Sequence, residues 1–274
     1  MIIRAVCTDI DGTLLDRTRQ LSKRTIAAFG KIPPDVPVIL ASSRMPSAMT
    51  HLQAELRITQ YPLICYNGGY VVSYNSASGV KIFDSVKIPA GVCESILACG
   101  KASTIHFSLY ADDNWYAPQH DAWTEREETI TKVRATIAKP EEVIHQWRRD
   151  GSGAHKIMCM GDAGEIGVLH KLLNEKHGGD IHVYLSRPTY LELAPKSVSK
   201  GSALKLLLEN EFRIPLSEVV AFGDNYNDID LLSVAGVGVA VANARPEVKA
   251  ISDQLTSASI DDGVAAALEE ILRF

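Results

Sequence analysis

The chain has 274 residues, of which 46% are hydrophobic and 22% charged, enough apolar material for one large domain or two moderate ones. Its 28 basic and 33 acidic residues form no long run of one sign, which argues against a nucleic-acid partner. The apolar runs are too short to cross a bilayer and the first residues lack the basic leader of a signal peptide, so we expect a cytoplasmic protein without a membrane anchor.

Short apolar runs alternate along the chain with amphipathic stretches, a rhythm typical of an α/β protein with a largely parallel sheet. The predicted strands are 2–10, 36–41, 63–66, 219–222 and 237–241. The predicted helices are 22–29, 46–56, 200–211 and 228–234. In such a fold a ligand site is expected at the carboxyl ends of the strands.

The middle of the chain has a higher density of aromatic and charged residues than the segments on either side. It contains the predicted strands 105–110 and 154–160 and the predicted helices 123–135 and 162–177. We interpret residues 83–190 as an α+β domain inserted between two parts of one core, 1–82 and 191–274.

Two carboxylates, Asp9 and Asp11, stand where the first predicted strand ends and Gly12 permits a turn. Residues two apart on an extended chain face the same side, so both acids can converge on one ligand. Aspartate and glycine are also common in ordinary turns, and this pattern alone does not decide between the two interpretations.

A second acidic group, Asp224 and Asp228, follows the predicted strand 219–222 and precedes a helix. It too has an ordinary interpretation, as a loop and helix cap. Four carboxylates gathered at two strand ends would repel one another, and a hard cation with oxygen ligands would hold them together. The two loops jointly predict Mg²⁺, with carboxylate oxygens from Asp9 and Asp224 and a backbone carbonyl from Asp11.

A phosphate ester needs further donors, because its transferring group carries charge on several oxygens. Ser42 and Ser43 end the second predicted strand and offer a hydroxyl and backbone amides at a helix start. Lys200 begins another helix, where a cation is unfavourable for the helix dipole, and this placement indicates a bound anion. A serine N-cap and a solvated surface lysine are the ordinary alternatives.

Taken together, these segments resemble the haloacid dehalogenase superfamily, in particular its Cof-like sugar-phosphatase branch. The resemblance is carried by DIDGTLL at 9–15, ASSR at 41–44, SKG at 199–201 and GDNYNDIDLL at 223–232, with the further phrases YNGG at 66–69 and VANA at 241–244. It implies a Rossmann-like parallel-sheet core and an inserted α+β cap domain. The middle matches more by position and length than by residues.

The resemblance also implies roles for single residues. Asp9 would be the nucleophile and a magnesium ligand, Asp11 the general acid and then base, and Lys200 would neutralise charge on nucleophile and phosphate. The other expected roles are phosphate binding by Ser42, Ser43 and Asn227, magnesium binding by Asp224 together with Asp9 and Asp11, and orientation of metal-bound water or Lys200 by Asp228. Ser43 stands where the family commonly has glycine, which predicts a slightly reshaped phosphate loop.

The expected function is a magnesium-dependent phosphatase acting on a small phosphorylated metabolite, a sugar phosphate or a phosphorylated cofactor, through an aspartyl-phosphate intermediate. A phosphomutase would keep the same nucleophile but return the phosphate to its substrate. A non-enzymatic phosphoacceptor or metal-binding module is a third interpretation, because acidic clusters at strand ends also serve there. Residues such as Trp115 and Arg187 in the inserted segment could contact a leaving group, although aromatic residues at such spacing are more often core. The substrate and the oligomeric state are left open.

Overall fold

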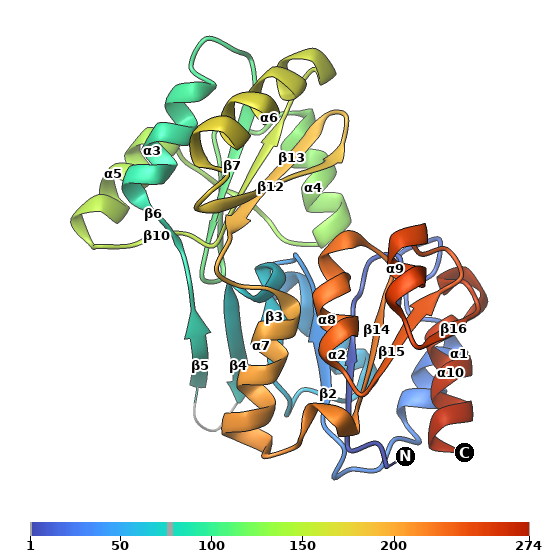
Figure 1. The fold of residues 1–274 in the computed structure, drawn as a ribbon. Helices are drawn as coiled ribbons and strands as arrows, with labels where there is room; N and C mark the ends of the chain where they lie inside the picture. Colours follow the sequence, from blue (N-terminus) through green and yellow to red (C-terminus); the bar gives the residue numbers. More distant parts are fainter. Residues whose placement is uncertain (1, 76–78, 274) are drawn as a thin grey trace. The chain divides into compact units, whose positions relative to one another are not determined.

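The computed structural model describes residues 2–75 and 79–273, which fall into two compact units (Figure 1). The first unit comprises Met1–Ser43, Met49–Asp84 and Ser199–Phe274. The second comprises Arg44–Ala48 and Ser85–Val198. The long insertion therefore builds a unit with a core of its own.

The first unit is built on a sheet with the strand order β16-β15-β14-β1-β2-β3-β4-β5. All neighbouring strands from β16 to β3 pair in parallel, and β4 runs antiparallel to β3. The strands are β1 (Ala5–Thr8), β2 (Val38–Ala41), β3 (Leu63–Cys65), β4 (Tyr70–Asn75), β5 (Gly79–Ser85), β14 (Val219–Gly223), β15 (Val237–Val241) and β16 (Gln254–Thr256). The central strands are buried along their whole length, as their apolar sequences require of a sheet covered on both faces.

Helices cover this sheet, and they pack in pairs that are distant in sequence. α7 lies against α8, and α1 lies against α10 (Figure 1). Their bounds are α1 (Lys23–Phe29), α2 (Ser47–Leu56), α7 (Lys200–Leu207), α8 (Ile229–Val234), α9 (Pro246–Ile251) and α10 (Gly263–Leu272). The parallel sheet with its helices confirms the predicted α/β class.

The second unit has a sheet of the order β12-β13-β11-β7-β8-β9, antiparallel apart from the β8–β9 pair. Its strands are β6 (Ile88–Pro89), β7 (His106–Ala111), β8 (Asn114–Ala117), β9 (Thr136–Ile137), β10 (Gly153–Ala154), β11 (Lys156–Met160), β12 (Ile181–Arg187) and β13 (Tyr190–Pro195), where β6 pairs with β10. Its helices are α3 (Ala90–Cys99), α4 (Ala122–Thr131), α5 (Pro140–Arg149) and α6 (Ala163–His177). One apolar cluster joins α3, α5 and α6 to the sheet.

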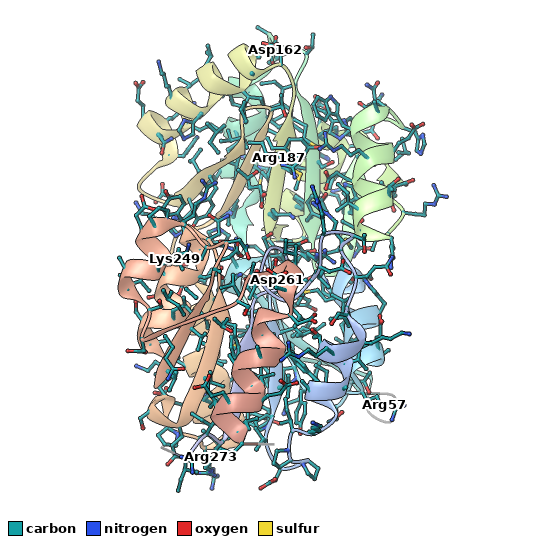
Figure 2. The ribbon with its side chains drawn as sticks, turned by 90° about the vertical axis from the view of Figure 1, so that its right-hand side faces the viewer. Arg57, Asp162, Arg187, Lys249, Asp261 and Arg273 are labelled. Atoms are coloured by element: carbon teal, nitrogen blue, oxygen red, sulfur yellow. The ribbon has the colours of Figure 1, made fainter. Side chains whose placement is uncertain are left out.

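The predicted segment 83–190 and the second unit differ at their carboxyl ends. β13 pairs with both β11 and β12, so residues 191–195 belong to the inserted sheet and the unit continues to Val198. Trp115 lies in the interior of this unit, with 2% of its surface exposed. Arg187, labelled in Figure 2, is exposed at the end of β12, with its guanidinium 5.7 Å from the ring of Tyr190.

No helix among the described residues combines the length and the apolar character needed to cross a membrane.

Candidate active site

Three predicted site residues lie at one edge of the first unit's sheet, because β1 is flanked by β14 and β2 and all three strands are parallel. Asp9 directly follows β1, and its N–H donates to the carbonyl of Phe222 at 3.0 Å. Asp224 follows β14 and Ser42 follows β2. Residues more than 200 positions apart in the chain thus meet at the carboxyl ends of neighbouring strands.

The loop after β1 is shaped to approach Asp224 closely. Gly12 has a φ of +87°, and a Cβ placed there would lie 2.6 Å from Asp224 Oδ2, so this position requires glycine for both reasons. Thr13 Oγ1 donates to Asp224 Oδ1 at 2.9 Å. Asn243 Nδ2 donates to the Gly12 carbonyl at 2.7 Å and ties the same loop to the segment after β15.

Lys200 is the first residue of α7, and Ser199 caps that helix by accepting from the backbone N–H of Ser202. The Lys200 side chain is fully buried, with 0% exposure. Nζ donates to Asp9 Oδ1 at 2.5 Å and to Asp228 Oδ1 at 2.7 Å. These two carboxylates compensate for a buried cation at the positive end of a helix dipole.

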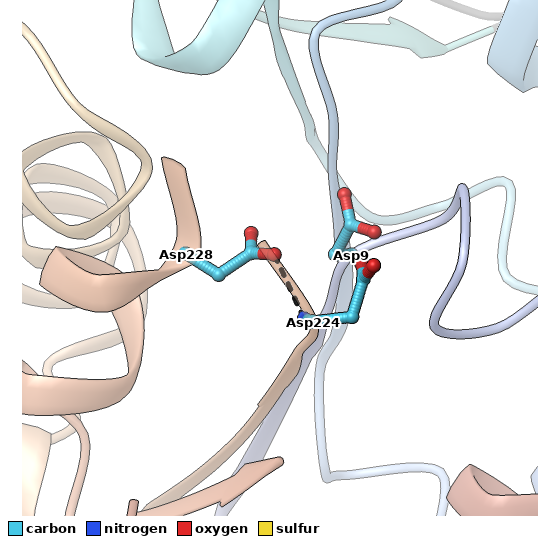
Figure 3. Close-up of side chains that lie close together, drawn as sticks. All are labelled: Asp9, Asp224 and Asp228. Atoms are coloured by element: carbon cyan, nitrogen blue, oxygen red, sulfur yellow. Dashed lines mark hydrogen bonds between the residues drawn. The ribbon is translucent and has the colours of Figure 1, made fainter. Parts of the chain in front are cut away.

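Asp228 has both of its carboxylate oxygens engaged. Oδ1 accepts from Lys200, and Oδ2 accepts from the backbone N–H groups of Asp224 and Asn225, each at 3.0 Å. Figure 3 shows the bond from the Asp224 N–H. Asp228 therefore holds the loop after β14 in shape and positions the lysine that contacts Asp9.

Asp9, Asp224 and Asp228 each offer a carboxylate oxygen, and these three atoms lie within 4.8 Å of one another. Figure 3 shows the carboxylates of Asp9 and Asp224 side by side, with Asp228 approaching from its helix. Lys200 supplies one positive charge against three negative ones. An oxygen-only donor set with residual negative charge fits a hard divalent cation such as Mg²⁺.

Burial and the neighbouring charges shift the pKa values of Asp9, Asp224 and Lys200. Burial raises the pKa of Asp9 well above its ordinary value, Lys200 opposes this rise, and the charges of Asp228 and Asp224 add to it. Burial, followed by the charge of Asp228, raises the pKa of Asp224 to about 6. Burial alone would lower the pKa of Lys200, but Asp228 and Asp9 raise it above its ordinary value.

The other predicted residues lie around this group. The Asp11 side chain is 39% exposed, outside the carboxylate group, with Oδ1 3.6 Å from an Arg19 nitrogen. Ser42 is buried and Ser43 half-buried at the end of β2. Asn227 lies between Tyr226 and Asp228, and its Nδ2 donates to Asn67 Oδ1 at 2.9 Å. The carbonyl of Asp11 as a metal ligand, and phosphate binding by Ser42, Ser43 and Asn227, stay predictions.

Comparison with known proteins shows to which family the chain belongs. The family model for haloacid dehalogenase-like hydrolases matches residues 6–268. The chain belongs to the haloacid dehalogenase-like hydrolases. It is 30% identical over 273 residues to a Haemophilus influenzae protein named as a phosphatase, covering 98% of both chains.

Two further proteins similar to this chain extend the comparison. A phosphoglycolate phosphatase of Archaeoglobus fulgidus is 29% identical over 266 residues, covering 97% of this chain and 96% of the relative. A crystal structure from Thermotoga maritima is 30% identical with a TM-score of 0.85, covering 98% of this chain and 97% of that one. The predicted superfamily, its Cof-like branch and the hydrolase class are confirmed.

Three residues that contact the site had no predicted role. Thr13 bonds to Asp224, Asn243 bonds to the loop after β1, and Asn67 bonds to Asn227. All three belong to motifs that carried the family resemblance. The motifs could have identified these residues as candidates, but their contacts are visible only in the structure.

Proposed function

We propose that this haloacid dehalogenase-like hydrolase is a magnesium-dependent phosphatase that forms an aspartyl phosphate on Asp9. The observation that carries the proposal is the environment of Asp9, a residue that is 5% exposed, hydrogen-bonded to Lys200 and grouped with Asp224 at the carboxyl ends of neighbouring strands. A carboxylate held this way has a fixed orientation toward an incoming phosphorus atom.

The proposed reaction divides into two steps. First, an Asp9 oxygen bonds to phosphorus as the ester P–O bond breaks, and Asp11 gives its proton to the departing alkoxide. Then Asp11 takes a proton from water, whose oxygen attacks phosphorus and releases Asp9 and inorganic phosphate.

The remaining residues supply charge and position. Lys200 would stabilise the negative charge shared by Asp9 and the phosphoryl group, and Ser42 would donate to a phosphoryl oxygen. Mg²⁺ held by Asp9 and Asp224 would neutralise the phosphate and orient it. Asp228 would keep Lys200 in place through the bond at 2.7 Å.

The proposed substrates are small phosphorylated metabolites, such as a sugar phosphate or a phosphorylated cofactor. Relatives are named for phosphoglycolate and for HMP-PP, which supports this class. The inserted unit, proposed as a cap, would select among leaving groups, since specificity requires contacts beyond the phosphate.

The test is a phosphate-release screen over sugar phosphates, phosphoglycolate, nucleotides and pyridoxal phosphate with magnesium. Asp9→Asn keeps the shape of the side chain and is expected to lower kcat by about 10⁴-fold or more, because an amide is a poor nucleophile. A chelator should abolish wild-type turnover. Full turnover in Asp9→Asn would contradict the proposal. Stable phosphorylation of Asp9 without release would favour a phosphoacceptor, and phosphate returned to the substrate would favour a mutase.

A further inference from the structure

A strained turn follows β3 beside the candidate active site. Three consecutive residues, Tyr66, Asn67 and Gly68, have φ values of 53°, 57° and 102°. The left-handed region is unfavourable for side chains other than glycine, above all for a bulky one such as tyrosine. Such a conformation persists only where its surroundings hold it, and it often marks a functional position.

Two other loops of the site hold this turn. The Asn67 N–H donates to the carbonyl of Ser42 at 2.9 Å. A Cβ at Gly68 would collide with the carbonyl of Ser199, the residue that caps α7 and precedes Lys200. The turn is therefore wedged between the predicted phosphate loop and the helix that carries the buried lysine.

The Asn67 side chain reaches a third loop. Its Oδ1 accepts from Asn227 Nδ2 at 2.9 Å, and both side chains are half-buried. Asn227 lies in the loop that also carries Asp224 and Asp228. One residue thus contacts the loops of Ser42 and Asn227, and its neighbour Gly68 packs on the start of α7.

The bond has a chemical consequence for Asn227. An amide Nδ2 carries two hydrogens, and committing one of them to Asn67 fixes the plane of the amide, which gives the second hydrogen a defined direction. A side chain fixed before binding loses less conformational entropy when a ligand accepts from it.

We propose that Asn67 is a positioning residue of the phosphate site, which orients Asn227 for a phosphoryl oxygen. The proposal rests on the phosphatase function proposed above. The left-handed turn serves to direct the Asn67 amide toward Asn227 while its backbone N–H holds the Ser42 loop.

Asn67→Gly is the sharpest test, because glycine keeps the left-handed backbone and removes only the amide. We expect the dissociation constant of inorganic phosphate, measured by calorimetry with magnesium, to rise about 3- to 10-fold, the size of one hydrogen bond. KM should rise by a similar factor while kcat changes less than about twofold, a split that general loss of structure would not produce. Arg57→Gly is the matched control, an exposed residue with a φ of 59° (Figure 2).

A double-mutant cycle with Asn227→Ala identifies the partner. In the wild type and in Asn67→Asp, which keeps an oxygen acceptor for Asn227, this change should weaken phosphate binding by the same factor. In Asn67→Gly it should have no further effect. The added charge of the aspartate is present in both members of its pair and cancels in the ratio. If Asn67→Gly does not fold, the wild-type and Asn67→Asp backgrounds still test the proposal, because unequal effects of Asn227→Ala in these two backgrounds would contradict it.

An undiminished effect of Asn227→Ala in the Asn67→Gly background would overturn the proposal, as would wild-type phosphate affinity in Asn67→Gly. Failure of the phosphatase function is a separate result, because a wild type that binds phosphate but turns over no substrate still reports on Asn67 through calorimetry. A wild type that binds no phosphate would overturn both.

Discussion

At the scale of single residues, Lys200 shows that neighbours in the fold can make an unfavourable charge favourable. In sequence it is a cation at the start of a helix, an unfavourable place. In the fold it is fully buried between Asp9 and Asp228, at 2.5 and 2.7 Å. Its charge compensates for part of the cost of burying these two carboxylates.

Lys200→Met should therefore destabilise the protein strongly. Removing one partner from a buried ionic group leaves charges without compensation, at about 3–5 kcal/mol of unfolding free energy. Lys205→Met, on the same helix, removes an exposed lysine 3.8 Å from Glu209 and should change stability little. Denaturant unfolding without magnesium measures both variants. Equal stability of the two would show that the buried network is not energetically important.

At the scale of elements, the segment that enters the second unit is fastened by a buried histidine. Ser85 ends β5, and its Oγ lies 3.0 Å from His155 Nε2. His155 Nδ1 accepts from the Asp112 backbone N–H at 2.8 Å, so the neutral ring carries its hydrogen on Nε2 and donates it to Ser85. Burial, aided by the charge of Lys87 and opposed by Asp112, lowers the pKa of His155 to about 3.

This shift predicts a loss of stability in acid. The unfolded chain binds a proton at this histidine near its ordinary pKa of 6.5, whereas the folded ring stays neutral down to about 3. Unfolding therefore takes up a proton in that window, and its free energy falls as the pH falls, by up to about 1.4 kcal/mol per pH unit. His155→Gln should flatten the pH dependence of urea unfolding between pH 6.5 and 4.5. His145→Gln, at an exposed position, should leave it unchanged; a wild-type slope in His155→Gln would refute the assignment.

At the scale of the whole molecule, the chain is two units with separate apolar cores, and the carboxylate group lies in the first one. Magnesium should therefore stabilise the units unequally. Hydrogen exchange measured by mass spectrometry should show added protection near Asp9 and Asp224 and none in α3 or α5. Asp224→Asn should remove the added protection. Equal protection of both units, or protection that survives in the variant, would speak against the proposed metal site.

Across the whole molecule, some helices and strands were predicted from the sequence and others were not. The buried strands 36–41 and 237–241 and the helices 22–29 and 162–177 lie within two residues of the observed elements, because each forms a local pattern of burial. The antiparallel strand β4, its neighbour β5 and the strands β12 and β13 were not predicted. Half-buried or exposed strands such as β5 and β12 have no continuous apolar run to mark them.

The family, the α/β class and the residue types at the candidate site follow from the amino-acid sequence alone, because motifs and apolar periodicity are local properties of the chain. The folded chain was needed to show that β14 lies beside β1, that Lys200 is buried between two acids, and that Asn67 bonds to Asn227. Strand order and side-chain partners depend on which distant surfaces pack together, and no local pattern encodes that choice.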